Sequence, residues 1–143
     1  VCYSPLGGGL LTGKYKGMAE PAQGTRLAFR TQIDGPRFWH SNGFKIAEIL
    51  EQVSSESGIP MVKLAIGWPL KRRFVTSVII GARNQVQIES NMEMGDWEML
   101  EDVWNRLEEK TRPEEEYLTW FNKKNYERFF SASEFHDEST ELL

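Results

Sequence analysis

A glycine-rich segment near the start of the 143-residue chain contains residue types that can bind phosphate. Gly8, Gly13 and Lys14 have the G-x4-G-K spacing of a phosphate-binding loop that follows a strand. A Walker-type loop needs Ser or Thr after the lysine to hold Mg²⁺, and Tyr15 stands there. This departure argues against a nucleotide hydrolase. Two interpretations stay open: a connection with one solvated lysine, or backbone N–H groups near a phosphate with Lys14 as a point charge.

A second candidate anion site follows the β-branched run 75–80 and begins at Gly81. Asn84 can cap a helix there, and a helix N-terminus presents unpaired N–H groups and a favourable dipole end. Arg83 adds a planar fork that suits a phosphate ester. The alternative is a capped helix with one solvated arginine.

Composition excludes several classes of function. The chain has 17 Lys and Arg against 21 Asp and Glu, so its net charge of −4 argues against nucleic-acid binding. The single Cys2 excludes an internal disulfide framework, and no Cys/His spacing suits a metal. His40 could touch a substrate or be a loop histidine near a helix start, His136 has no partner in sight, and neither is expected to be catalytic. No apolar run approaches the roughly 18 residues of a membrane span. We therefore expect a cytoplasmic protein without a metal site or membrane partner.

Two strands can be predicted, one at 1–4, stopped by Pro5, and one at 75–80. The second is almost wholly apolar, as in parallel sheets covered on both faces. Between the strands lie a segment at 13–39 without sustained periodicity, which is long for an idle connection, and then helices. This order is typical of βα units with a parallel sheet. Because the chain starts at Val1, inside an apolar run, we expect it to be part of a longer protein.

Apolar spacing, capping residues and prolines predict the helices. They are expected from Ser41 or Asn42 to Gly58, from Pro60 to Leu70, from Asn84 to Asn91, from Asp96 to Leu107, and over 114–130. Residues 131–143 read as a polar tail.

The two candidate anion segments, taken together, resemble the aldo-keto reductase superfamily. The resemblance is strongest to the branch that includes potassium-channel β subunits and bacterial NADP-dependent oxidoreductases. Tyr3 to Tyr15 resembles that family's segment at the seventh barrel strand, and Val78 to Asn91 resembles its eighth strand and following helix. The resemblance covers residues 1 to about 110. It implies NADP(H) as cofactor and the following cofactor-binding residues: Tyr3, Ser4, Pro5, Leu6, Gly7, Gly8, Lys14, Arg26, Gly81, Ala82, Arg83, Gln87 and Asn91.

The resemblance also implies roles for these residues. Tyr3 would stack on the nicotinamide ring, and the backbone of Ser4 to Gly8 would cradle the pyrophosphate. Lys14 and Arg26 would contact the cofactor phosphates, with the segment 13–39 folded over the dinucleotide.

At the other end of the cofactor, Arg83 and Gln87 match positions around the adenosine 2′-phosphate, which favours NADP(H) over NAD(H). Asn91 would read the adenine edge. Ser90 departs from the family, because relatives often have Glu there, so we expect weaker or water-mediated adenine contacts.

The implied fold is an α/β (β/α)8 TIM barrel, of which this chain would contain only the equivalents of the last two strands and their helices. Such barrels need about 250 residues. Residues 1–130 would form the C-terminal part of the barrel, with 131–143 as a tail. The family's catalytic Asp, Tyr, Lys and His come from earlier strands, so no catalytic residue is expected here.

We therefore expect the cofactor-binding half of a reductase of small carbonyl compounds. The alternative is a non-catalytic binding or assembly module. A two-stranded pair leaves its edges open, so such a module could form a homo-oligomer through them.

Overall fold

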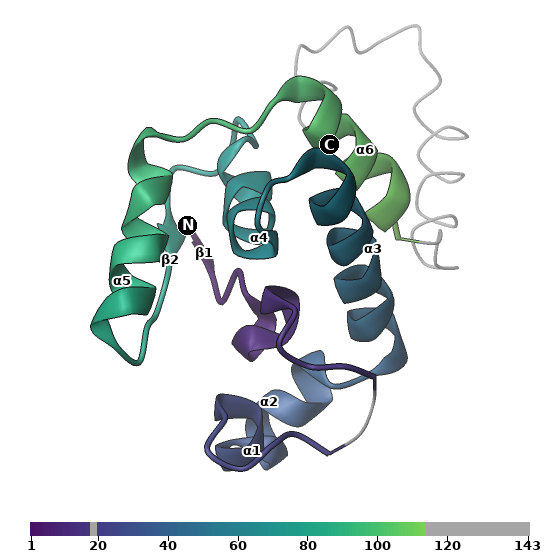
Figure 1. Cartoon of the computed structure of the whole chain (residues 1–143), viewed down its shortest axis with the longest axis vertical. Helices are drawn as coiled ribbons and strands as arrows, with labels where there is room; N and C mark the ends of the chain where they lie inside the picture. Colours follow the sequence, from purple (N-terminus) through teal and green to yellow (C-terminus); the bar gives the residue numbers. More distant parts are fainter. Residues whose placement is uncertain (18–19, 114–143) are drawn as a thin grey trace, which may run out of the picture. The chain divides into compact units, whose positions relative to one another are not determined.

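The computed structural model describes residues 1–17 and 20–113 (Figure 1). The chain divides into the units Val1–Thr111 and Arg112–Leu143, and only the first is described in full apart from residues 18 and 19. The expected helix at 114–130 and the tail at 131–143 lie outside the described residues. The described elements are β1 (Cys2–Tyr3), the 3-10 helix η1 (Gly7–Thr12), α1 (Arg26–Phe29), α2 (Thr31–Phe38), α3 (Ser41–Ser57), α4 (Met61–Leu70), β2 (Val78–Ile79), α5 (Gln85–Met92), the 3-10 helix η2 (Glu93–Asp96) and α6 (Glu101–Thr111).

The two strands form a parallel pair, as the order of elements predicts. Cys2 is paired with Val78 and Tyr3 with Ile79. Both strands are shorter than expected, and the side chain of Ile79 is 60% exposed. The expectation of a strand covered on both faces is therefore wrong for this unit, because no described element covers the Ile79 side chain.

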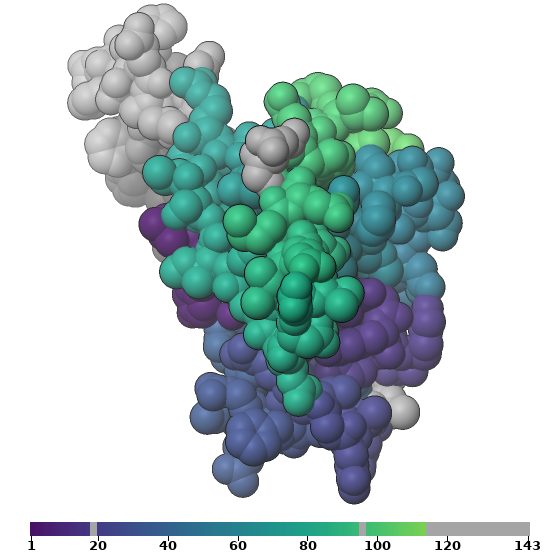
Figure 2. All heavy atoms as spheres, turned by 60° about the vertical axis from the view of Figure 1, so that its left-hand side comes forward, coloured from purple at the N-terminus to yellow at the C-terminus, as the bar shows by residue number. Residues whose placement is uncertain are grey.

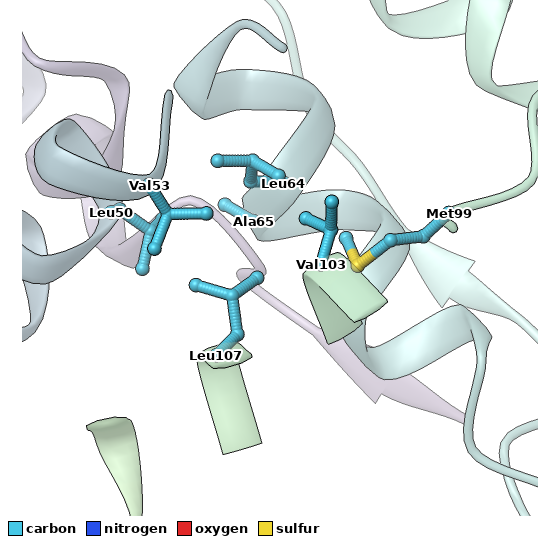
Figure 3. Close-up of a cluster of buried hydrophobic side chains, with 7 residues drawn as sticks. All are labelled: Leu50, Val53, Leu64, Ala65, Met99, Val103 and Leu107. Carbon is cyan, nitrogen blue, oxygen red and sulfur yellow. The ribbon is translucent and has the colours of Figure 1, made fainter. Parts of the chain in front are cut away.

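The main core lies between α3, α4 and α6, where apolar side chains from the three helices meet (Figure 3). Val53 and Leu64 are 0% exposed and Leu107 is 1% exposed. Each such side chain contributes about 1.5–3 kcal/mol when it is taken fully out of water. The apolar spacing of α3 and α4 predicted these helices correctly, and Gly58 ends α3 in the left-handed conformation.

The expected helix from Asp96 begins later than predicted. Residues 93–96 form η2, Trp97 is extended, and α6 starts only at Glu101. Met99 lies between Trp97 and α6 and is buried in the main core at 3% exposure, whereas Leu100 is 63% exposed. The burial of Met99 thus holds the chain in a non-helical path where apolar spacing alone predicted a helix.

The segment 13–39, predicted to lack regular structure, contains α1 and α2 and is called the connecting segment below. The hydroxyl of Thr25 caps α1 by accepting from the Ala28 N–H at 3.4 Å. The helix after the connecting segment, α3, is capped by His40, whose Nδ1 accepts from the Gly43 N–H at 3.2 Å. The predicted caps Ser41 and Asn42 are wrong, because both are already helical.

Candidate functional site

The two glycine-containing motifs meet at one edge of the sheet. β1 and β2 are parallel, and Tyr3, the last residue of β1, is paired with Ile79, the last residue of β2. Both strands therefore end at the same edge of the sheet. The turn that starts at Ser4 follows β1 directly, and Gly81 follows β2 by two residues. Crevices outside the carboxyl ends of parallel strands are where open α/β sheets and TIM barrels bind ligands.

The turn after β1 has a backbone suited to an anion. Ser4 has a φ of +57°, which is uncommon for a residue with a side chain, and Gly7, Gly8 and Gly9 have φ values of 54°, 66° and 99°. The Gly7 N–H donates to the Ser4 carbonyl at 3.0 Å. Such turns direct successive N–H groups into concavities that hold anions. Strained backbone conformations such as the positive φ of Ser4 cluster at functional sites.

Lys14 lies against this turn. A Cβ added to Gly9 would come within 2.5 Å of the Lys14 Nζ, so glycine leaves room for the amine. The amine also lies 5.0 Å from the centre of the Tyr15 ring. Among the described residues no carboxylate forms an ion pair with Lys14, so its charge is available to a ligand.

Tyr3, at the end of β1, is 67% exposed. Its hydroxyl accepts from Nη2 of Arg37 at 3.3 Å, and the Arg37 guanidinium lies 5.5 Å from the centre of the Tyr3 ring. The connecting segment therefore reaches β1 through Arg37, a contact that the sequence did not indicate.

Arg83 links the turn after β2 to the connecting segment. Its Nη1 donates to the carbonyl oxygen of Gly24, 59 positions away in the sequence, and its backbone N–H donates to Oε1 of Gln87 at 2.9 Å. Asn84 caps α5 as predicted, with Oδ1 accepting from the Gln87 N–H at 3.0 Å. Arg83 and Gln87 are exposed together with the flanking Gly81 and Ala82.

Asn91, the other residue expected to contact the adenosine end, lies near the end of α5 and is only 5% exposed. The structure thus brings Arg83 and Gln87 together at the surface, whereas Asn91 is buried.

Arg26 is held by a buried carboxylate that sequence reasoning missed. Asp34 is 0% exposed, and its Oδ2 accepts from Nε of Arg26 at 2.8 Å. Arg30 and Arg37 form ion pairs with the same carboxylate. The Arg26 hydrogen bond and the three positive charges hold the pKa of Asp34 below its usual value, against the opposing effect of burial. The i,i+4 and i,i+3 spacing of Arg30, Asp34 and Arg37 is the signal that could have found this cluster.

A hollow of the described unit lies away from these residues. It has a volume of about 490 Å³ between α4 and α6 and is lined by residues that include Trp97 and Trp104. No residue of the predicted site lines it. Lys71 at its rim donates to Glu101, and this hydrogen bond raises the pKa of the lysine. We therefore place the candidate site at the sheet edge, where the motif residues gather.

Two further features of the described residues concern membranes and metals. None of the helices there is long and apolar enough to cross a membrane. In the same part of the chain, no group of three or more His, Cys, Asp or Glu side chains could hold a metal ion.

Comparisons with known proteins match the same region. A model described as the aldo/keto reductase family matches residues 1–112. L-glyceraldehyde 3-phosphate reductase of Escherichia coli O157:H7 is 31% identical over 94 residues, covering 65% of this chain and 27% of the relative. A probable voltage-gated potassium channel subunit beta of Arabidopsis thaliana is 33% identical over 101 residues, covering 66% and 29%.

An aldo-keto reductase of Babesia bovis is 30% identical over 118 residues, covering 78% of this chain and 41% of the relative. The chain thus spans between about a quarter and two-fifths of the length of these relatives.

Proposed function

The chain belongs to the aldo/keto reductase family, and on that basis we propose that it forms the NADP(H)-binding part of an oxidoreductase. The complete enzyme would pass hydride between nicotinamide and a small carbonyl compound or alcohol. One observation carries the proposal. The turn after β1, the turn after β2 and the connecting segment are joined at one sheet edge by the Arg83 contact to Gly24 and the Arg37 contact to Tyr3.

At the nicotinamide end, the exposed ring of Tyr3 offers a stacking surface. In the turn of Ser4 to Gly8, Pro5 has no N–H and the Gly7 N–H donates to Ser4, so the backbone N–H groups of Leu6 and Gly8 are the ones offered to the pyrophosphate. Lys14 adds positive charge beside that turn, and Arg26 begins α1, whose Leu27 packs against Gly8 of the turn.

At the adenosine end, Gly81 and Ala82 leave the backbone open beside Arg83, whose guanidinium suits a 2′-phosphate monoester. Gln87 holds the Arg83 backbone through its Oε1. Asn91 would face the adenine after a rearrangement that exposes its amide. An arginine at this position favours the phosphorylated cofactor.

In this proposal β1 and β2 are equivalents of the last two strands of a (β/α)8 barrel, and residues 1–130 belong to that barrel. The reacting groups that move protons on the carbonyl compound would come from barrel strands outside this chain. This chain's own residues bind and orient the dinucleotide. The nicotinamide supplies the hydride when the cofactor is bound.

A titration of the purified chain with NADPH and with NADH tests the proposal. Quenching of tryptophan fluorescence reports binding, and Trp39 stands in the connecting segment next to Tyr15, with ring centroids 5.0 Å apart. We expect saturable quenching and tighter binding of NADPH. Replacing the exposed Tyr3 with Leu serves as the matched variant and should weaken both cofactors equally. If neither NADPH nor NADH gave saturable quenching, the proposal would be refuted.

A second candidate function is a non-catalytic assembly module that self-associates. It is favoured by apolar side chains exposed on β1, β2 and α5, among them Ile79 at 60%, Val86 at 73% and Met92 at 67%. Figure 2 shows α5 at the front of the molecule. Exposed strand edges and apolar patches of this kind mark association surfaces. Analytical ultracentrifugation at micromolar concentration tests it, and a monodisperse monomer would exclude it.

A further inference from the structure

Three arginines of the connecting segment surround one buried carboxylate. Nε of Arg26 lies 2.8 Å and Nε of Arg30 3.3 Å from Oδ2 of Asp34, while Nη1 of Arg37 lies 3.6 Å from Oδ1. The side chain of Asp34 is 0% exposed, whereas those of the arginines are 47%, 42% and 40% exposed. The carboxylate is thus enclosed and the cations reach the surface.

The pairing leaves positive charge available at the surface. Within the described residues these arginines form ion pairs with no other carboxylate, so the cluster has an excess of two positive charges. Arg26 and Arg30 face Asp34 through Nε, which leaves the two terminal nitrogens of each guanidinium for another acceptor. That pair of nitrogens is the fork that binds phosphate in a bidentate manner.

The cluster lies beside the turn after β1. A Cβ added to Gly8 would lie 3.3 Å from a methyl carbon of Leu27 and 3.4 Å from the ring of Phe38. These two residues directly follow Arg26 and Arg37 in the sequence. Arg37 also contacts Tyr3, the residue that directly precedes this turn. The helices that carry the arginines therefore pack against the turn through Leu27 and Phe38, with Arg26 and Arg37 next to these contacts in the sequence.

We propose that Asp34 is a positioning residue that holds the guanidinium of Arg26 beside the turn, so that its terminal nitrogens receive the pyrophosphate of the dinucleotide. The inference rests on the proposed function, because it assigns a support to that site's phosphate contacts. A long arginine side chain otherwise loses rotamer freedom when it binds. Asp34 removes part of that loss in advance, which is how preorganisation raises affinity.

The variant Asp34→Asn separates positioning from charge, because the two predict opposite signs. It keeps the side-chain volume and removes one negative charge near the bound anion. Charge alone predicts that inorganic pyrophosphate and NADPH bind about twofold to threefold more tightly. Positioning predicts that both bind about tenfold more weakly, because the guanidiniums lose their common anchor. Calorimetry with each ligand, on variants with wild-type circular dichroism, measures the difference.

Adenosine 2′-monophosphate is the matched ligand, because the proposed function assigns its phosphate to Arg83, away from Asp34. Its affinity should change less than twofold in Asp34→Asn. Equal weakening of this ligand would indicate general unfolding of the site and would overturn a specific role of Asp34.

A measurement on the unchanged chain keeps the inference testable if Asp34→Asn does not fold. In ¹⁵N spectra the Nε–H signal of Arg26 should be protected from exchange and should stay so when pyrophosphate saturates the chain. Loss of this protection on binding would overturn the inference, because the anion would then displace the carboxylate instead of using the guanidinium that it holds.

The outcomes separate the two proposals. If the unchanged chain binds pyrophosphate with the expected Asp34 dependence but not NADPH, the proposed function fails and the role of Asp34 stands. If it binds NADPH and Asp34→Asn binds equally well or more tightly, the role of Asp34 fails and the proposed function stands. If neither ligand binds, both fail.

Discussion

The proposed recognition of the 2′-phosphate by Arg83 can be tested by replacing that arginine with alanine. The guanidinium is exposed and, within the described residues, donates only to the Gly24 carbonyl. Alanine therefore removes two things, a tie to the connecting segment and a charged hydrogen-bond donor for the cofactor. The first loss affects NADPH and NADH alike, whereas the second affects NADPH alone. The ratio of the two affinities isolates the phosphate contact.

The magnitude follows from the chemistry of that contact. Hydrogen bonds to charged groups contribute about 1.5–3 kcal/mol, and the exposure of Arg83 places the value toward the lower end. At about 1.4 kcal/mol per tenfold, a loss of about 1.5–2 kcal/mol should lower the preference for NADPH over NADH roughly 10-fold to 30-fold. Raising the salt concentration should reduce the preference of the unchanged chain, because exposed charges are screened.

Two further variants control for charge and for local structure. Arg73 is also exposed, precedes β2 at the opposite end of the strand, and forms no ion pair among the described residues. Arg73→Ala should leave the NADPH preference unchanged. Gln87→Glu keeps an oxygen that accepts from the Arg83 N–H but places a negative charge beside the phosphate. The Gln87→Glu variant should bind NADPH at least tenfold more weakly, while its affinity for NADH changes little. An unchanged ratio of NADPH to NADH affinity in both Arg83→Ala and Gln87→Glu would refute the assignment of Arg83 to the 2′-phosphate.

Three other predictions concern stability. Gly43→Ala should destabilise by about 2 kcal/mol in urea unfolding, because the new Cβ would lie 2.4 Å from the carbonyl oxygen of Phe38, which outweighs a helix gain of about 1 kcal/mol. Leu107→Ala should cost about 3 kcal/mol in the same assay, since Leu107 is 1% exposed in the main core, and a loss under about 1 kcal/mol would contradict that packing. Because the pKa of folded Asp34 lies below its ordinary value of 3.8, its ion pairs stabilise the fold above about pH 4 and this contribution is lost as the pH falls through the folded pKa. Urea unfolding from pH 7 to pH 3 should show the loss, and Asp34→Asn should remove that part of the pH dependence.

Local signals in the sequence predicted several elements correctly. The apolar spacing of α3 and α4, the left-handed Gly58 and the Asn84 cap all act within about four residues, so they can be read without knowing the fold. The parallel pairing of β1 and β2 followed from the order of elements.

Other features depended on contacts that no local pattern contains. α2 has Asp34 as its only buried residue and Phe38 as its partly buried apolar contact, so it gives no apolar stripe to read. The start of α6 was predicted too early, because burial of Met99 against the other helices decides the path of the chain before it. The residue that caps α3 is His40, one residue before the expected position.

The cofactor-binding residues remain a prediction of the motifs in the sequence, and the tertiary structure adds how those motifs are joined. Spacing and residue type alone predict the glycine turn, Lys14 and Arg83 as anion-binding positions, since backbone freedom and charge are properties of the residues themselves. Whether a charge is paired, buried or held in place is decided by distant neighbours. Arg83 donates a hydrogen bond to Gly24, 59 positions away in the sequence, and the Asp34 carboxylate is shielded from water only when the connecting segment packs. Burial is a property of the whole fold, so the enclosed carboxylate and the arginines around it became visible only there.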